Sequence, residues 1–113
     1  MCGFVGFLSA SLPRNASQLL RHMADAIRER GPDGEGQWID EGAGIALGHR
    51  RLSIVDLSAA GHQPMVSNSG RYVIIFNGEI YNHHLLRAEL EAASPSHGWR
   101  GHSDTETLLA GIE

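Results

Sequence analysis

The residue of this sequence best placed to do chemistry is Cys2, which directly follows Met1. Removal of Met1 by a methionine aminopeptidase would leave a thiol and a free α-amine on the same residue. An α-amine has a reference pKa of about 7.7 to 8.0, so near neutral pH it can take a proton from its own side chain. Position two therefore predicts a nucleophile with a built-in base, and a small buried cysteine without a chemical role is the alternative.

The second candidate is the pair Asn77–Gly78, which directly follows the apolar segment 71–76. An asparagine at a strand end can aim its side-chain amide into a site, and a glycine lets the next backbone N–H approach a ligand closely. Together they predict an oxyanion hole, which stabilises negative charge on an attacked carbonyl oxygen. Asn-Gly is also the favoured pair of a type I′ hairpin turn, so a turn without chemical function stays open.

Arg51 is the candidate for binding an anion, because one arginine can make two charge-assisted hydrogen bonds to one carboxylate. It follows Arg50, and neighbouring side chains of a strand point to opposite faces of the sheet. Only one of the two arginines can therefore face a site, and we expect that one to be Arg51. The other is expected to be a solvated arginine.

Two acidic residues, Glu79 and Asp104, are suited to binding an ammonium group. Glu79 follows the Asn77–Gly78 pair, and Asp104 lies at the predicted start of a helix. An acid in the first turn of a helix also stabilises the helix dipole, so Asp104 has a structural explanation as well. Together with Arg51, these residues offer groups of both charges to a small ligand.

Composition excludes several other classes of function. The chain has 113 residues and a net charge of −4, and all nine of its basic residues are arginine. It therefore has no cationic stripe for nucleic acid and no lysine for a Schiff base or a P-loop. The single cysteine excludes an internal disulfide, and the seven histidines contain no HExxH motif, so no metal site is expected. Since no apolar segment approaches the roughly 20 residues of a membrane span, we expect a cytoplasmic protein without a membrane partner.

The elements that must position the candidate residues begin with short strands. Apolar segments bounded by glycines and acidic turns predict strands over residues 2–8, 37–39, 44–48, 51–55 and 71–76. The last of these is apolar throughout, which is typical of a strand covered on both faces. Helical patterns separate the strands, so the sequence predicts an α+β fold, and its length fits one domain or part of one.

Three helices are predicted between and after these strands. The first follows a capping signal at Asn15, ends before Gly31–Pro32, and should bury an apolar stripe of Leu20, Met23, Ala24 and Ile27. The second should run from His83 to about Ala92, with Asn82 as its cap. The third should start at the Ser-x-x-Glu capping box over residues 103–106 and still be helical at the last residue.

Five motifs occur in order along the chain and resemble those of one family. They are Met1–Gly3, Arg30–Gly34, Gly48–Asp56, Asn77–His83 and Ser103–Asp104. The series resembles the class II glutamine amidotransferase domain of asparagine synthetases. The resemblance implies the fold of the N-terminal-nucleophile hydrolases, an αββα sandwich of two antiparallel sheets between helical layers. Because the family's domain is longer, we expect residues 1–113 to be its N-terminal portion, with the ATP-dependent synthetase domain absent.

The resemblance also implies catalytic roles for three of the candidate residues. Cys2 matches the nucleophile that attacks the side-chain amide of L-glutamine, and its own α-amine matches the proton shuttle. Asn77 and Gly78 match the oxyanion hole, which contacts the substrate. The implied reaction passes through a γ-glutamyl thioester, releases ammonia, and ends with hydrolysis to glutamate.

Substrate recognition and partners follow from the same resemblance. Arg51 matches the arginine that binds the α-carboxylate of glutamine, and Glu79 and Asp104 match the acids that bind its α-ammonium. No cofactor is expected in this segment, whereas ATP and Mg²⁺ are expected in the missing synthetase domain, which would transfer the ammonia to aspartate. Amidation of another carboxylate, such as a sugar acid or a biosynthetic-cluster substrate, and a non-catalytic module of the same fold stay open, as does a homodimer.

Overall fold

A computed structural model describes all of residues 1–113, and its larger sheet contains the first three strands. These antiparallel strands lie in the order β1 (Gly3–Leu8), β3 (Ile45–Arg51) and β2 (Gly34–Asp40). The register places Arg50 opposite Gly3 and Arg51 opposite Gly34. The strands predicted over 2–8 and 37–39 are thus confirmed.

The prediction of two separate strands over 44–48 and 51–55 is wrong. One strand, β3 (Ile45–Arg51), continues past the first predicted segment and ends at the first residue of the second, so residues 52–55 form no strand. Beyond it, the backbone N–H of Leu52 donates to the Cys2 sulfur at 3.2 Å, and that of Ser53 donates to an Asp33 carboxylate oxygen at 2.8 Å. These side chains take up the donors that a continued strand would use in its ladder, so the chain leaves the sheet here.

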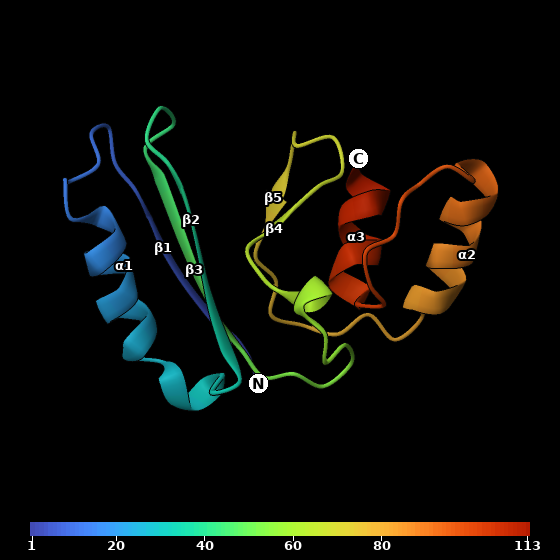
Figure 1. The fold of residues 1–113 in the computed structure, drawn as a ribbon, viewed down its shortest axis with the longest axis horizontal. Coiled ribbons are helices and arrows are strands. Elements are labelled where there is room, and N and C mark those ends of the chain that lie inside the picture. Colours follow the sequence, from blue (N-terminus) through green and yellow to red (C-terminus); the bar gives the residue numbers. More distant parts are fainter.

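Helix α1 (Ala16–Asp25) covers one face of the larger sheet, as Figure 1 shows. Leu20 and Ala24 of the predicted apolar stripe are fully buried against the strands. Gly48 of β3 makes this contact close, because a Cβ there would lie 3.2 Å from the Leu20 side chain. The expected capping bond is absent, since the side chain of Asn15 accepts no hydrogen bond from the helix. A 3₁₀ turn, η1 (Arg28–Arg30), leads from the helix to Gly31.

The second half of the chain contains a small sheet and two helices. A 3₁₀ turn, η2 (Ala59–Gly61), precedes the antiparallel pair β4 (Met65–Val66) and β5 (Val73–Ile74). The predicted strand over 71–76 is therefore reduced to two residues, because β4 offers only two partners. The side chains of 72–76 are half-buried, not covered on both faces.

Helices α2 (His83–Ala93) and α3 (Asp104–Ile112) confirm the last two predicted helices, with Glu113 as the C-cap of α3. Asn82 precedes α2 without a capping bond from its side chain. Ser103 does cap α3, because its hydroxyl oxygen accepts the Glu106 N–H at 3.1 Å. The reciprocal half of the capping box is absent, since the buried Glu106 carboxylate instead accepts N–H groups from the preceding loop.

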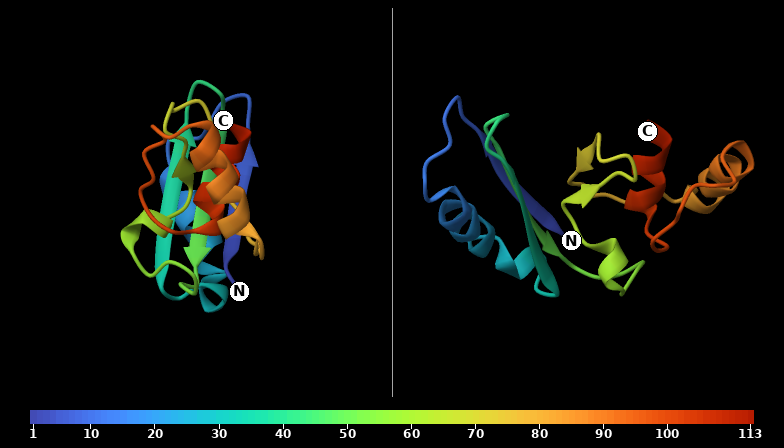
Figure 2. Two further views of the ribbon diagram at one scale, coloured as in Figure 1. Left: turned by 90° about the vertical axis from the view of Figure 1, so that its right-hand side faces the viewer. Right: turned by 45° about the horizontal axis from the view of Figure 1, so that its top comes forward.

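The elements are stacked in layers, which can be followed in Figure 1 and in the right-hand view of Figure 2. Helix α1 lies outside the larger sheet, the small sheet lies on that sheet's other side, and α3 and α2 lie beyond it. The chain is thus a mixed α/β structure with two antiparallel sheets and three α-helices. None of these helices is both long and apolar enough to cross a membrane.

Candidate functional site

A cavity of about 330 Å³ lies where β3 ends and the second half of the chain begins. Its wall is built from four separate segments: the N-terminus, the end of β3 with its following loop, the segment after β5, and the start of α3. All six predicted site residues line it: Cys2, Arg51, Asn77, Gly78, Glu79 and Asp104. No three His, Cys, Asp or Glu side chains of the chain lie together in a way that could hold a metal ion.

Cys2 is fixed at the cavity wall by the first residue after β3. Its sulfur accepts the backbone N–H of Leu52 at 3.2 Å, and its thiol donates to the Leu52 carbonyl oxygen at 3.5 Å. The carbonyl oxygen of Cys2 accepts a hydrogen bond from Nε of Arg30 at 3.3 Å. The side chain is only partly buried. The thiol is therefore both oriented and accessible from the cavity, unlike an inert core cysteine.

Asn77 and Gly78 present unused hydrogen-bond donors. Neither the Asn77 side-chain amide nor the Gly78 N–H donates to any group of the protein. A type I′ turn requires positive φ at both central residues, and neither residue has one, so the hairpin alternative is wrong. A Cβ at position 78 would lie 2.6 Å from the Phe76 ring, so any larger residue would require that ring to move. The two donors are free for a ligand oxygen.

Arg50 and Arg51 point to opposite faces of β3. Arg50 is buried beneath α1, where it pairs with Asp25 and, at 3.0 Å, with Glu35, and donates to the Ala24 carbonyl oxygen. The expectation of a solvated arginine is therefore wrong, because the helix that covers the sheet supplies partners for the charge. Arg51 lines the cavity and has no carboxylate partner. Its charge is available to an anion.

Backbone carbonyl groups of the loop after β3 hold the Arg51 side chain. Its Nη1 donates to the Ser58 carbonyl oxygen at 2.7 Å, and its Nη2 donates to that of Asp56. Gly61 leaves room for the guanidinium group, because a Cβ there would overlap Nη2. A guanidinium carries five N–H donors, so these two bonds leave three for a ligand.

Asp104 and Glu79 differ in how firmly they are held. Asp104 is buried, and its two carboxylate oxygens accept the N–H of Ile80 at 2.9 Å and that of Thr105 at 2.8 Å. It therefore has a structural role at the start of α3, but each oxygen keeps a second lone pair for an ammonium group. Glu79 is exposed and without a partner, so its carboxylate can move to meet a ligand.

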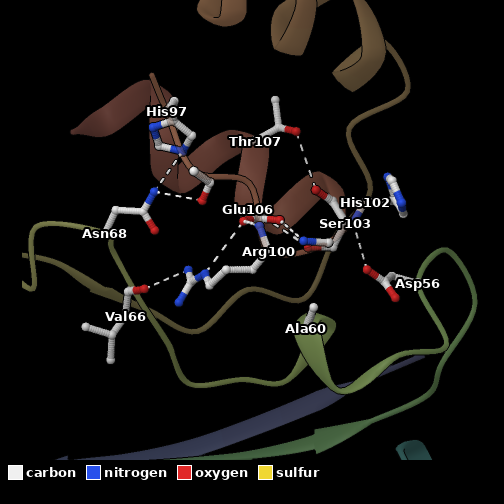
Figure 3. Close-up of polar contacts among 12 residues, drawn as sticks. Asp56, Ala60, Val66, Asn68, His97, Arg100, His102, Ser103, Glu106 and Thr107 are labelled. Atoms are coloured by element: carbon white, nitrogen blue, oxygen red, sulfur yellow. Dashed lines mark hydrogen bonds and ion pairs between the residues drawn. The ribbon is translucent and has the colours of Figure 1, made fainter. Parts of the chain in front are cut away.

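Two further polar residues of the cavity wall were missed by sequence reasoning. Gln63 is buried, and its side chain joins the segment after β5 to helix α3. Asp56 joins the loop after β3 to the segment before α3, because one carboxylate oxygen accepts from Ser58 and the other from the His102 N–H at 2.8 Å, drawn in Figure 3. These bonds, that to His102 first, lower the pKa of Asp56 to about 2.

His49 is a buried titratable group behind the cavity. It is 1% exposed, and neither ring nitrogen has a hydrogen-bond partner. Burial lowers its pKa to about 4, and the nearby Arg51 and His62 also lower it. Because His49 and Arg51 are two residues apart in β3, they share the face of the sheet that points away from α1. The imidazole is therefore neutral at physiological pH.

Comparisons with known proteins show to which family the chain belongs. The model of a family described as the glutamine amidotransferase domain matches residues 1–113. Glutamine-hydrolyzing asparagine synthetases 1 and 2 of Bacillus subtilis are 48% and 41% identical to the chain, over 97% and 96% of its length. Amidase chry2 of Gibberella zeae is 34% identical over 97% of the chain. The chain spans only 17%, 14% and 17% of these three relatives, respectively.

Proposed function

The chain belongs to the glutamine amidotransferase domain family, and from this premise we propose that it hydrolyses L-glutamine to glutamate and ammonia. The observation that carries the proposal is the cavity in which four chain segments bring together a thiol, two unused N–H donors, an unpaired arginine and two carboxylates. This set is complementary to an amino acid with a side-chain amide, because each group of that ligand finds a matching partner.

In the proposed reaction, the Cys2 sulfur attacks the side-chain carbonyl carbon of glutamine. After removal of Met1, the α-amine of Cys2 takes the thiol proton and passes it to the leaving nitrogen. The carbon–nitrogen bond of the tetrahedral intermediate breaks, which releases ammonia and leaves a γ-glutamyl thioester. Water then attacks the thioester and yields glutamate and the free thiol. The side-chain amide of Asn77 and the N–H of Gly78 stabilise the negative oxygen in both tetrahedral intermediates.

The charged groups of the cavity hold the other end of the substrate. Arg51 pairs with the α-carboxylate, and Glu79 and Asp104 pair with the α-ammonium. The free N–H donors of Arg51 and the free lone pairs of Asp104 support this assignment. Recognition of both charges distinguishes free glutamine from the neutral backbone of a glutamine within a peptide.

We extend the proposal to the protein that contains this chain. Asparagine synthetases among the relatives favour an enzyme that transfers the ammonia to aspartate, with ATP and Mg²⁺ bound by a synthetase domain of the same protein. Residues 1–113 would then be the N-terminal part of its glutaminase domain, and the single cysteine suits a cytoplasmic location. The similarity to amidase chry2 supports the second candidate, an enzyme that amidates another carboxylate.

The layers of the fold support a matching structural proposal. The order α1, larger sheet, smaller sheet, then α3 and α2 is the order of an αββα sandwich. The larger sheet contacts the segment that leads into β4 at Gly36 of β2, since a Cβ at Gly36 would overlap the Gln63 carbonyl oxygen. On this basis we propose the N-terminal-nucleophile hydrolase fold for the chain, with Cys2 directly before its first strand.

The test uses the full-length protein with two alterations at the N-terminus. Cys2→Ala removes the nucleophile, and one uncleaved residue placed before Cys2 removes its free α-amine. We expect both proteins to lose glutamate release from glutamine and to keep synthesis from added ammonia, which serves as the control for folding. Glutaminase activity that survives in either protein would refute the assigned role of Cys2 and would favour another nucleophile, whereas a wild-type protein without glutaminase activity would favour a binding module.

A further inference from the structure

We propose that Gln63 is a positioning residue that sets the oxyanion donors and the ammonium-binding acid at a fixed separation. The inference rests on the proposed glutaminase function. It gives a role to Gln63, which has none in the reaction proposed above. Gln63 lies between η2 and β4, is 7% exposed, and lines the cavity. It would act through its neighbours rather than on the substrate.

The backbone of Gln63 is anchored on the larger sheet. Its carbonyl oxygen packs so closely on Gly36 of β2 that no side chain fits there. The ring of the preceding residue, His62, makes a 2.9 Å hydrogen bond with the carbonyl oxygen of Glu35 in the same strand. The side chain of Gln63 therefore extends from a fixed point on the sheet that also carries Arg51.

The amide group of Gln63 makes one hydrogen bond to each of two other walls of the cavity. Its Oε1 accepts the N–H of Phe76 at 2.6 Å, immediately before the Asn77–Gly78 pair. Its Nε2 donates to the Thr105 hydroxyl oxygen at 3.2 Å, immediately after Asp104 in the first turn of α3. The Gln63 side chain thus contacts the residue before the Asn77–Gly78 donors and the residue after Asp104.

Only a side chain with an acceptor and a donor on one rigid plane can make both bonds at once. An apolar replacement would leave the part-buried Phe76 N–H without a partner, and the segment would have to shift to satisfy it. Asn77 would move with it, because the two residues are consecutive. The hydrogen bond from the Ile80 N–H to Asp104 also joins this segment to α3, but it lies on the C-terminal side of Asn77 and Gly78. It therefore cannot hold the backbone at Phe76, on their N-terminal side.

The test compares three variants of the full-length enzyme in steady-state glutamine hydrolysis. Gln63→Leu removes both bonds and should lower kcat by about 10- to 100-fold, the cost of misplacing a reacting group by about 1 Å. Thr105→Val removes only the bond toward α3 and should raise the glutamine KM about fivefold, the equivalent of one neutral hydrogen bond, with kcat little changed. This split between kcat and KM would not arise from a general loss of stability.

Thr107→Val is the matched control. Thr107 lies one half-turn further along α3, is as buried as Thr105, and donates from its hydroxyl to the Ser103 carbonyl oxygen at 3.4 Å, as drawn in Figure 3. It does not line the cavity. We expect Thr107→Val to lower the melting temperature as Thr105→Val does while keeping the wild-type KM. Equal KM values for these two variants, or wild-type kcat in Gln63→Leu, would overturn the inference.

Failure of the glutaminase proposal would be seen separately. If the wild-type protein releases no glutamate, the proposed function fails, and amide hydrogen exchange then tests the role of Gln63 directly. Exchange at Phe76 should accelerate in Gln63→Leu and stay unchanged in Thr107→Val. Unchanged exchange in both would show that Gln63 does not support the segment. If Gln63→Leu does not fold, the comparison of Thr105→Val with Thr107→Val decides the question alone.

Discussion

Adjacent arginines on β3 provide a sharp test of how the strand faces the site. Arg50→Ala and Arg51→Ala remove the same group from consecutive positions, one beneath α1 and one at the cavity. We expect Arg50→Ala to lower the free energy of unfolding without changing glutamine binding, and Arg51→Ala to weaken glutamine binding. Arg51→Lys should also be impaired, because an ammonium group cannot reproduce the two parallel bonds of a guanidinium to a carboxylate.

The two magnitudes follow from the surroundings of each side chain. A hydrogen bond to a charged group contributes about 1.5 to 3 kcal/mol, so its loss in Arg51→Ala should raise KM by about 10- to 150-fold. Arg50 is buried, but the carboxylates of Asp25 and Glu35 are 43% and 52% exposed and stay hydrated when it is removed. Its loss should therefore cost about 2 kcal/mol, less than the roughly 3 to 5 kcal/mol of breaking a fully buried pair.

The assay combines glutamate release at varied glutamine concentration with denaturant unfolding of the same preparations. kcat should change little in Arg51→Ala, because the carboxylate is bound equally in the ground and transition states. The reasoning is refuted if Arg50→Ala raises KM while Arg51→Ala leaves it unchanged.

Two further predictions concern the oxyanion donors and the buried imidazole. Asn77→Gly should keep the melting temperature and lower kcat by about 100- to 1,000-fold with little change in KM, and full activity in the folded variant would reject the donor role. Burial lowers the pKa of His49 in the folded chain to about 4, from an ordinary value of 6.5. As pH falls through this window, the unfolded chain therefore binds a proton that the folded chain lacks. Unfolding measured at pH 7 and pH 4.5 should show a loss of up to about 3 kcal/mol in the wild type that is absent in His49→Gln, and equal losses would contradict the burial argument.

The elements nearest to local sequence signals could be predicted. Strand β1 follows from its apolar run, and helix α1 follows from apolar periodicity, since Leu20 and Ala24 lie on the face that the pattern selects. The helix is shorter than predicted, because it ends at Asp25, before Ile27 of the predicted stripe. Alternation along β3 was sufficient to separate Arg50 from Arg51. The end of β3 was not predictable, because it depends on bonds to Cys2 and Asp33, which are distant in sequence.

The site residues were found by type and by resemblance, whereas their supports were not. Gln63 carries no signal of its own, because its importance depends on Phe76 and Thr105 meeting it in space. Glu106 belongs to the predicted capping box, but its carboxylate accepts the N–H groups of Arg100 at 2.6 Å and Gly101 at 2.9 Å. Figure 3 shows Glu106 beside Arg100. Tertiary contacts, rather than the helix N-terminus, therefore determine what the Glu106 carboxylate binds.

The manner in which Arg51 is held has a consequence for how the site can diversify. Its partners at Asp56 and Ser58 are main-chain oxygens, which every amino acid possesses. The apolar side chains of Ile54 and Val55, which line the same cavity, are exposed and outside this anchoring. Replacing Ile54 or Val55 changes the shape and polarity of the cavity wall, whereas the guanidinium group of Arg51 keeps its position. A mutant library restricted to positions 54 and 55 therefore explores new specificities while Arg51 and its backbone partners stay unchanged.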